Sequence, residues 1–463
     1  MISSAGFPSL LSRGFPINVE NQPVERPRHA GVLVFWPERI LGPHPGLREI
    51  NLVCWTSLVA FLLVPLCVVH FIQVKHGAGS IRKLSSDFVY VYGVGQIAHR
   101  YSAARIYDSS LQQRVFLAIQ PPREGTYYGP SPYPPFVAMF FAPFTYVSFE
   151  SAYLLWLGIS LSLYLIGIGA TAAAVFPDER VKISLIVCLA LAFYPFIFGT
   201  LLNGQLATIA ICSAGLAIYQ ENLGHLFRSG LALALLSYKP TLLLLLIPML
   251  LLTRRFKTLL GFTAGTGILI LVGTAFAGVN IWPAYVHMLR YFGQVAGVSG
   301  ASHLQLWKYL DLCSSFSAIA GGRSVAGTAL LMSAIGASAA ALAALLWNSP
   351  SRGRPAQWLT WAATLTWTLL LNVYVPIYDS VLVIIAVVLT LGALRDLGRS
   401  IAAEWITFLA IVLFALSWET ESFAKVHGVQ LLTVILVVLG SVQLLLLQQA
   451  TRQRAPELAP SGV

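Results

Sequence analysis

Charged residues are scarce in this chain of 463 residues. Only 10% of its residues are Asp, Glu, Lys or Arg, whereas an average soluble domain carries about a quarter. Hydrophobic residues make up 57%, and the mean hydropathy is +0.75. This composition excludes an ordinary soluble enzyme and predicts an all-α polytopic membrane protein.

Signatures of metal and cofactor binding are also lacking. The five cysteines show no Cys-x-x-Cys pair and no Cys/His spacing suited to a metal. Asp-x-Asp, Walker A and His-Glu-x-x-His patterns are absent, and Gly93 and Gly95 form only a fragment of a dinucleotide loop. We therefore predict no metal, no cofactor and no soluble nucleotide-sugar domain.

The chain has long uncharged segments instead. Residues 51–74 contain no charged side chain and exceed the roughly 20 residues that one membrane crossing needs. Similar stretches recur, several of them long enough for two crossings: residues 183–220, 258–289, 324–351 and 355–378. On this length criterion we predict about 11 or 12 transmembrane helices.

The net charge of +11 is explained by topology, so we predict no nucleic-acid partner. Arginines fall in short connections or the tail, and positive charge on such segments marks the cytoplasmic side of a membrane. They are Arg352, Arg354, Arg395, Arg399, Arg452 and Arg454. The alternate connections contain the acidic residues Asp379, Glu419 and Glu421.

Three parts follow from this topology. Residues 1–48 are expected to form a cytoplasmic extension with little fixed structure, residues 49–450 the membrane domain, and residues 451–463 a cytoplasmic tail. Within the membrane domain, residues 75–132 form a large first external loop and residues 278–323 a second one.

Apolar residues recur at helical spacing in the first external loop. Phe88, Val91, Val94 or Gly95, and Ala98 would share one face of a helix. We predict an interfacial helix with its apolar side towards the membrane and its polar side towards the head groups. A plain connector is the alternative, although the loop is long for one.

Asp87 is the strongest candidate for a catalytic residue. It follows the first predicted span in a chain with only 18 acidic residues. A carboxylate at this place could accept a proton from a hydroxyl nucleophile, which typically contributes about 10²–10⁴-fold to the rate. The alternative is that Asp87 caps the helix that follows it.

Lys239 lies in the middle of an apolar run, where a charge usually marks a site or a paired cavity. An ammonium on a flexible stem suits a phosphate group, and snorkelling or an internal ion pair is the alternative. Pro240 follows and interrupts helical hydrogen bonding. Basic residues flank the run on both sides, so it is either one span or a re-entrant pair of half-helices; they are Arg228, Arg254, Arg255 and Lys257.

Other polar residues interrupt apolar sequence. Asn203 and Gln205 flank a glycine and could bind a polar ligand or join neighbouring helices. Tyr378 and Asp379 begin a later span on the outer side, where an N-cap role is the alternative. His303 lies alone in the second external loop, where a histidine is more often incidental.

These residues, in this order, resemble glycosyltransferase family 87, multispanning bacterial mannosyltransferases of the GT-C class. Around His303 the chain departs from the Asn-Gln-Ser-Leu-like element that the family usually has. The matching pieces are Asp87-Phe88 with Tyr90, Arg105-Ile106-Tyr107-Asp108, Tyr133-Pro134-Pro135, Asn203-Gly204-Gln205, Lys239-Pro240 and Tyr378-Asp379.

The resemblance implies a GT-C fold and transfer of a sugar, most often mannose, on the external face of a bacterial plasma membrane. The donor would be a polyprenyl-phosphate sugar and the acceptor a hydroxyl of a glycolipid or glycan. Asp87 would be the general base of an inverting reaction. Residues expected to bind substrate or phosphate are Lys239, Arg105, Tyr90, Asn203, Gln205, Tyr378, Asp379 and His303.

Two other functions fit parts of this pattern. A transporter or lipid-carrier flippase also has broken helices and an intramembrane lysine, but this chain shows no internal repeat of the kind common in transporters. A non-catalytic subunit of an envelope-assembly complex is the other alternative, and the presence of Asp87 argues against it.

Overall fold

The structure is a computed structural model that describes residues 87–120, 129–298, 305–319, 325–347, 353–372 and 375–452. All of these belong to one compact unit, Glu49–Val463. The expected extension 1–48, the expected first span 51–74 and tail residues 453–463 lie outside the described residues. The described residues form helices and no strand, with one isolated bridge between Tyr309 and Pro376, so the all-α class is confirmed.

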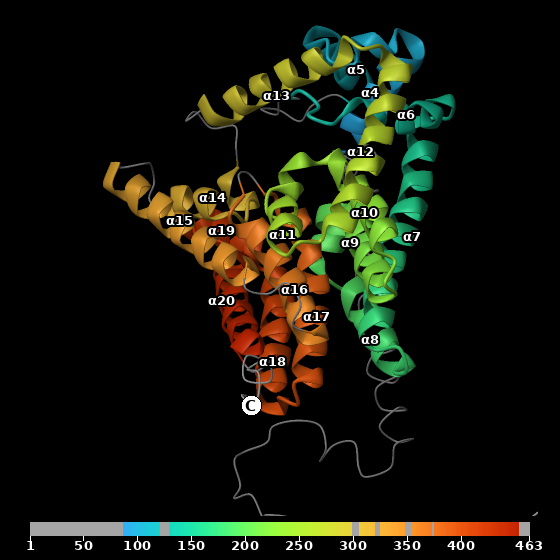
Figure 1. Ribbon diagram of the computed structural model, residues 1–463. Coiled ribbons are helices and arrows are strands. Elements are labelled where there is room, and N and C mark those ends of the chain that lie inside the picture. Colours follow the sequence, from blue (N-terminus) through green and yellow to red (C-terminus); the bar gives the residue numbers. More distant parts are fainter. Residues whose placement is uncertain are drawn as a thin grey trace, which may run out of the picture. The chain divides into compact units, whose positions relative to one another are not determined.

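Helices of widely different length make up this part of the chain (Figure 1). The α-helices are α4 (Phe88–Arg100), α5 (Ser109–Ile119), α6 (Pro135–Phe141), α7 (Phe149–Val175), α8 (Arg180–Leu191), α9 (Ala207–Asn222), α10 (Leu226–Leu233), α11 (Leu246–Leu252), α12 (Phe256–Ala277), α13 (Ile281–Val298), α14 (Leu312–Ile319), α15 (Val325–Trp347), α16 (Arg354–Leu370), α17 (Leu382–Asp396), α18 (Ser400–Ser417), α19 (Thr420–His427) and α20 (Leu431–Arg452). Short helices of other types are η1 (Ala103–Arg105), η2 (Ala142–Tyr146), η3 (Pro195–Leu201), η4 (Ala234–Tyr238), η5 (Pro240–Leu243), η6 (Leu306–Lys308) and η7 (Ile377–Val381).

Six described helices are long and apolar enough to cross a membrane, and a seventh crossing results if the pair Lys182–Leu191 and Pro195–Leu201, bent by 55°, is one span. The chain is therefore a multi-pass membrane protein. The shorter apolar helices among the described residues are Pro135–Tyr146, Leu226–Tyr238 and Pro240–Leu252, each below the roughly 20 residues that one crossing needs. Residues 133–147 form only α6 and η2, where prolines limit the helix.

The helices lie in two neighbouring groups. In one, α7 and α10 both contact α9, and α10 also contacts α12. In the other, α16 contacts α17 and α20, and α18 contacts the same two helices (Figure 1). Contacts of α17 with α7 and α9 join the groups.

The segment around Lys239 is a re-entrant pair of half-helices. Leu226–Tyr238 leads into the helices and Pro240–Leu252 leads out. The two outer ends of this pair lie together, because Arg255 Nη1, just after α11, is 2.5 Å from Glu221 Oε1, just before α10. The chain therefore enters and leaves the group of helices at the same end. This is the re-entrant arrangement, one of the two possibilities that the basic residues on both flanks allowed.

Helix α12 then runs beside α10 in the same direction. A Cβ added to Gly261 would lie 2.1 Å from the carbonyl oxygen of Phe227, and a Cβ added to Gly265 would lie 2.5 Å from the Cβ of Ala234. Both contacting positions move towards the C-terminus together, from Phe227 with Gly261 to Ala234 with Gly265, so the two helices run parallel. The Gly-x-x-x-Gly motif of α12 is thus used for close packing within one chain.

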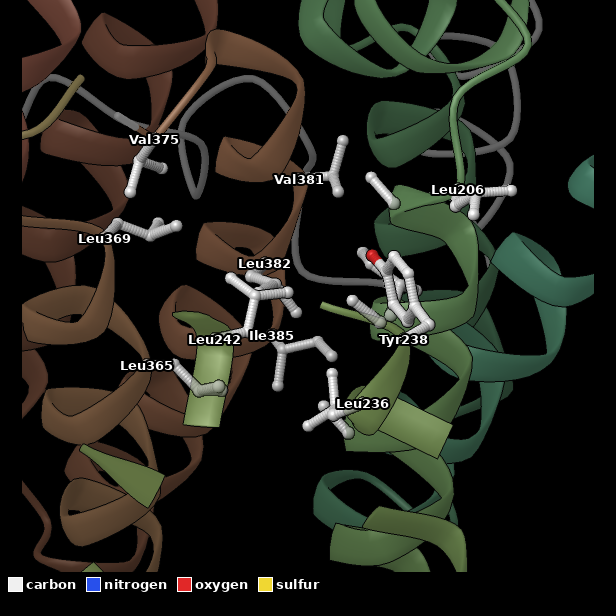
Figure 2. Packing of buried hydrophobic residues seen from close by; sticks show 14 of the residues in the cluster. Leu206, Leu236, Tyr238, Leu242, Leu365, Leu369, Val375, Val381, Leu382 and Ile385 are labelled. Atoms are coloured by element: carbon white, nitrogen blue, oxygen red, sulfur yellow. The ribbon is translucent and has the colours of Figure 1, made fainter. Parts of the chain in front are cut away.

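Apolar side chains enclose the tip of this re-entrant pair. Figure 2 shows Leu236 and Tyr238 before the tip and Leu242 after it, near Leu382 and Ile385 of α17. Each of these side chains is at most 3% exposed. Irregular backbone at membrane depth is tolerated only inside protein or around a cavity, and this packing meets that requirement for the tip.

Two of the arginines expected on the cytoplasmic side, Arg354 and Arg395, lie at one end of the helices. Arg354 Nη2 donates to Asn222 Oδ1 at 2.7 Å, and Arg395 Nη1 donates to Glu179 Oε1 at 3.2 Å. Asn222 ends α9 and Glu179 precedes α8, so residues far apart in sequence meet here. We call this the arginine end; the opposite end of α9 begins just after Gln205.

The helix expected in the first external loop is α4. Phe88, Val91 and Val94 are at most 3% exposed, as the spacing of apolar residues predicted. The surface that covers them is protein: α4 packs against α5, α6 and η2, and the Phe88 ring lies 5.5–6.0 Å from the rings of its aromatic neighbours. The sequence predicted that this apolar face contacts the membrane. In the structure, aromatic side chains of the protein cover it.

Candidate functional site

Asp87 lies at the start of α4 without acting as its cap. The Asp87 side chain makes no capping hydrogen bond, whereas Asp108 at the start of α5 accepts one from the Leu111 N–H at 3.1 Å. Asp87 Oδ2 instead accepts a hydrogen bond from Gln205 Nε2 at 2.7 Å. The carboxylate is therefore held by a side chain 118 residues away and is not used to stabilise its own helix.

The turn that carries Gln205 is fitted closely to the start of α4. The Phe88 N–H donates to the Asn203 carbonyl at 3.1 Å. Gly204 has a φ of +71°, and a Cβ there would lie 2.7 Å from the Cβ of Phe88, so both the conformation and the close approach favour glycine. The Trp156 indole donates to the Gly204 carbonyl at 3.1 Å. The turn thus fixes Asp87 and Gln205 relative to each other.

Gln205 links Asp87 to a tyrosine. The Tyr133 hydroxyl donates to Gln205 Oε1 at 3.3 Å, while the amide nitrogen of Gln205 donates to Asp87. Both ends of the amide are therefore used, which fixes its orientation. Tyr90 of α4 lies within electrostatic range of Tyr133, and its ring is 5.3 Å from that of Phe116. The sequence offered Tyr133 only as part of a motif of the family resemblance, so its link to Asp87 is a finding of the structure.

Lys239 and Asp379 form an ion pair at the tip of the re-entrant segment. Lys239 Nζ contacts Asp379 Oδ2, and the same nitrogen lies 4.8 Å from the centre of the Tyr378 ring. Asp379 is 1% exposed and the Lys239 side chain 19%. The internal ion pair, which the sequence gave as the alternative, is present, and the remaining ammonium protons can still be donated to a ligand.

Neighbouring segments hold Tyr378 and Asp379 in place. They lie in η7, where the Tyr378 carbonyl accepts a hydrogen bond from the Thr200 hydroxyl of η3 at 3.3 Å. From the second external loop, Asp311 Oδ2 accepts a bond from the Val375 N–H at 2.9 Å. Asp311 is fully buried and also binds Ser314 at the start of α14, so it attaches this loop to the segment before η7.

The two pairs belong to one cluster. Tyr378 lies within electrostatic range of Asp87, Asp379 and Tyr133, and the Tyr133 ring stacks on the Tyr238 ring at 6.5 Å between centroids. We call Asp87, Gln205, Tyr133, Tyr238, Lys239, Tyr378 and Asp379 the acid–lysine cluster. It combines a carboxylate, an ammonium and several phenol rings at the end of α9 opposite the arginine end, the kind of converging polar groups that marks a ligand site.

Arg105 and His303 are not joined to this cluster. The Arg105 guanidinium pairs with Asp108 at 2.7 Å and is half-exposed at 53%, so its described contact stabilises the first external loop. A substrate-binding role for it stays a prediction. His303 lies outside the described residues. Lys308, which the sequence did not single out, lies in η6 within electrostatic range of Asp87.

Burial and neighbouring groups act in opposite directions on Asp87. Burial raises the pKa of its carboxyl above the ordinary value, while the Gln205 hydrogen bond and the Lys308 ammonium lower it. The net direction is upward. A general base is most efficient when its pKa approaches the working pH, so this shift favours the role expected of Asp87.

We predict that Gln205→Leu moves the acid limb of the kcat/KM profile to higher pH. Loss of the hydrogen bond to the ionised carboxylate raises the Asp87 pKa further, and the reaction requires the ionised form. A pH series on the purified variant measures the shift. Gln220→Leu, near the opposite end of α9, is the matched control and should leave the limb in place. An unmoved limb in Gln205→Leu would contradict this link.

Comparison with known proteins gives one family. The model for glycosyltransferase family 87 matches residues 132–376, more than half of the chain. No curated protein and no solved structure matches. Asp87 precedes the matched range and Asp379 follows it closely, and the structure brings both into contact with residues inside it, Gln205 and Lys239.

Proposed function

Because the chain belongs to glycosyltransferase family 87 and is a membrane glycosyltransferase, we propose that it transfers mannose from a polyprenyl-phosphate donor to an acceptor hydroxyl. The observation that carries the proposal is the acid–lysine cluster, which pairs a buried carboxylate with an ammonium at the tip of a re-entrant segment. A glycolipid or glycan would supply the hydroxyl. The expected place is the external face of a bacterial plasma membrane.

Asp87 would act as the general base. Its carboxylate accepts the proton of the acceptor hydroxyl while that oxygen attacks the anomeric carbon. The bond between this carbon and the phosphate oxygen breaks from the opposite side, which inverts the configuration. Gln205 holds one carboxylate oxygen at 2.7 Å and leaves the other, Oδ1, for the incoming hydroxyl.

Lys239 would stabilise the leaving group. Breaking the glycosyl bond leaves a polyprenyl phosphate with one more negative charge than it carried as a diester. An ammonium aimed at developing charge stabilises the transition state most where water is excluded. Asp379 holds the Lys239 ammonium in place through the ion pair, and the Tyr378 ring beneath the ammonium limits its movement.

The two ends of the helices support the proposed side of the membrane. The acid–lysine cluster lies at the end of α9 opposite the arginine end, and basic connections mark the cytoplasm. Nucleotide sugars are confined to the cytoplasm, so a site on the other face needs a sugar carried by lipid. This reasoning supports a polyprenyl-phosphate donor.

The donor class is tested with the purified full-length protein in liposomes. Radiolabelled mannose is supplied either on polyprenyl phosphate or on a guanosine diphosphate carrier, with a membrane-lipid extract as acceptor pool. We expect label in the acceptor only from the lipid-linked donor. Transfer from the nucleotide sugar would contradict the donor class, and movement of lipid-linked sugar across the bilayer without transfer would favour a flippase.

A further inference from the structure

We propose that Asp379 Oδ1 and the Tyr238 hydroxyl form a subsite that binds one hydroxyl group of the donor sugar. The proposal rests on the proposed function, because it assigns the part of the acid–lysine cluster that would recognise the sugar being transferred. It adds specificity to a site whose other residues would supply the base and the phosphate contact.

Both atoms are buried and lack a hydrogen-bond partner among the described residues. Tyr238 is 3% exposed and Asp379 is 1% exposed. The second carboxylate oxygen, Oδ2, contacts Lys239, while Oδ1 and the Tyr238 hydroxyl have no partner in the described part of the chain. Buried polar atoms are rarely left without a partner, so two in one cluster indicate a place for a polar ligand.

The residues of these two atoms are connected both to the base and to the phosphate contact. Tyr238 directly precedes Lys239, and its ring stacks on Tyr133 with 29° between the ring planes. Tyr133 reaches Asp87 through Gln205. Asp379 contacts Lys239, the residue next to Tyr238, so the two groups belong to the same part of the cluster. In the proposed complex the anomeric carbon faces Asp87 and the phosphate faces Lys239, and the Tyr238 hydroxyl and Asp379 would contact the sugar.

The chemistry of the two atoms selects a hydroxyl as ligand. A carboxylate oxygen only accepts hydrogen bonds, whereas a phenol both donates and accepts. A sugar hydroxyl can donate to Asp379 Oδ1 and accept from Tyr238 at the same time. A phosphate oxygen would be repelled by the carboxylate, and a prenyl chain would leave both atoms without partners.

The experiment compares wild type with Tyr238→Phe on polyprenyl-phosphate mannose and on analogues that each lack one sugar hydroxyl. The substitution removes one oxygen atom and keeps the stacked ring, so the thermal midpoint should not fall. We expect wild-type kcat/KM to drop roughly tenfold or more with one analogue. Tyr238→Phe should show a similar drop with the complete sugar and little further loss with that same analogue.

Tyr285→Phe is the matched control. Its hydroxyl is also buried without a partner among the described residues, but it lies in α13, beside Tyr107 and outside the acid–lysine cluster. It should discriminate among the analogues as wild type does. If Tyr238→Phe also discriminates as wild type does, the subsite is wrong while the transferase function stands. If wild type uses no polyprenyl-phosphate sugar, the proposed donor fails and the subsite with it.

Discussion

Asp87→Asn is expected to lower kcat by about 10²–10⁴-fold, the usual contribution of a general base. The amide matches the carboxylate in shape but cannot accept the proton of an acceptor hydroxyl. Since Asp87 is not the helix cap of α4, and since a neutral group is easier to bury, the thermal midpoint should not fall. Steady-state kinetics in lipid, with a melting curve on the same sample, measure both quantities.

The control for Asp87→Asn is a second acid in the same neighbourhood. Burial raises the pKa of Glu421 above its ordinary value, and Lys308 lies within electrostatic range of both acids. Glu421→Gln therefore removes a similar partly buried charge without touching the acid–lysine cluster, and kcat should stay near the wild-type value. A kcat loss of the same size in both variants would point to a change in local charge and away from base catalysis by Asp87.

Lys239→Met is expected to have the second large effect. Removing the ammonium leaves Asp379 charged and buried, and breaking a buried ion pair typically costs about 3–5 kcal/mol of stability. Donor affinity should fall as well, because the phosphate loses its cation. Equilibrium binding of labelled polyprenyl-phosphate mannose and a thermal melt distinguish the two consequences.

A double variant separates the structural role of the Lys239–Asp379 pair from its role in donor binding, in which Lys239 would contact the phosphate and Asp379 the sugar. Lys239→Met combined with Asp379→Leu removes both charges, and apolar replacement of a whole buried pair is often neutral or stabilising. The melting midpoint should recover towards that of wild type while donor binding stays weak. Recovery of donor affinity together with stability would show that Lys239 serves only as the partner of Asp379.

Features that a short stretch of sequence reveals could be predicted, whereas contacts between residues far apart in the sequence could not. Asp87 was identified because an acid beside the first span is unusual in so apolar a chain. The choice between base and cap could not be made from local sequence, since it is decided by Gln205, 118 residues away. The partner of Lys239 is separated from it by 140 residues, so the ion pair could be given only as an alternative.

The fold shows the same limit. Basic residues on both flanks of Lys239 allowed a re-entrant segment, but the contact between Glu221 and Arg255 is what brings its ends together. The family resemblance placed Tyr133 among the motifs, whereas Tyr238 had no recognisable pattern, because one tyrosine in an apolar run also fits ordinary core packing. Their importance depends on ring stacking and on an unpartnered hydroxyl, which only three-dimensional structure reveals.

The central claim is that one cluster binds a lipid-linked sugar and activates its acceptor. A single-turnover experiment tests it: wild type and Asp87→Asn are loaded with labelled polyprenyl-phosphate mannose, the acceptor lipids are added, and bound and transferred label are counted over time. We expect equal loading of both proteins and rapid transfer by wild type alone. Equal transfer by both would remove Asp87 from the mechanism and show that the cluster does not activate the acceptor in this way.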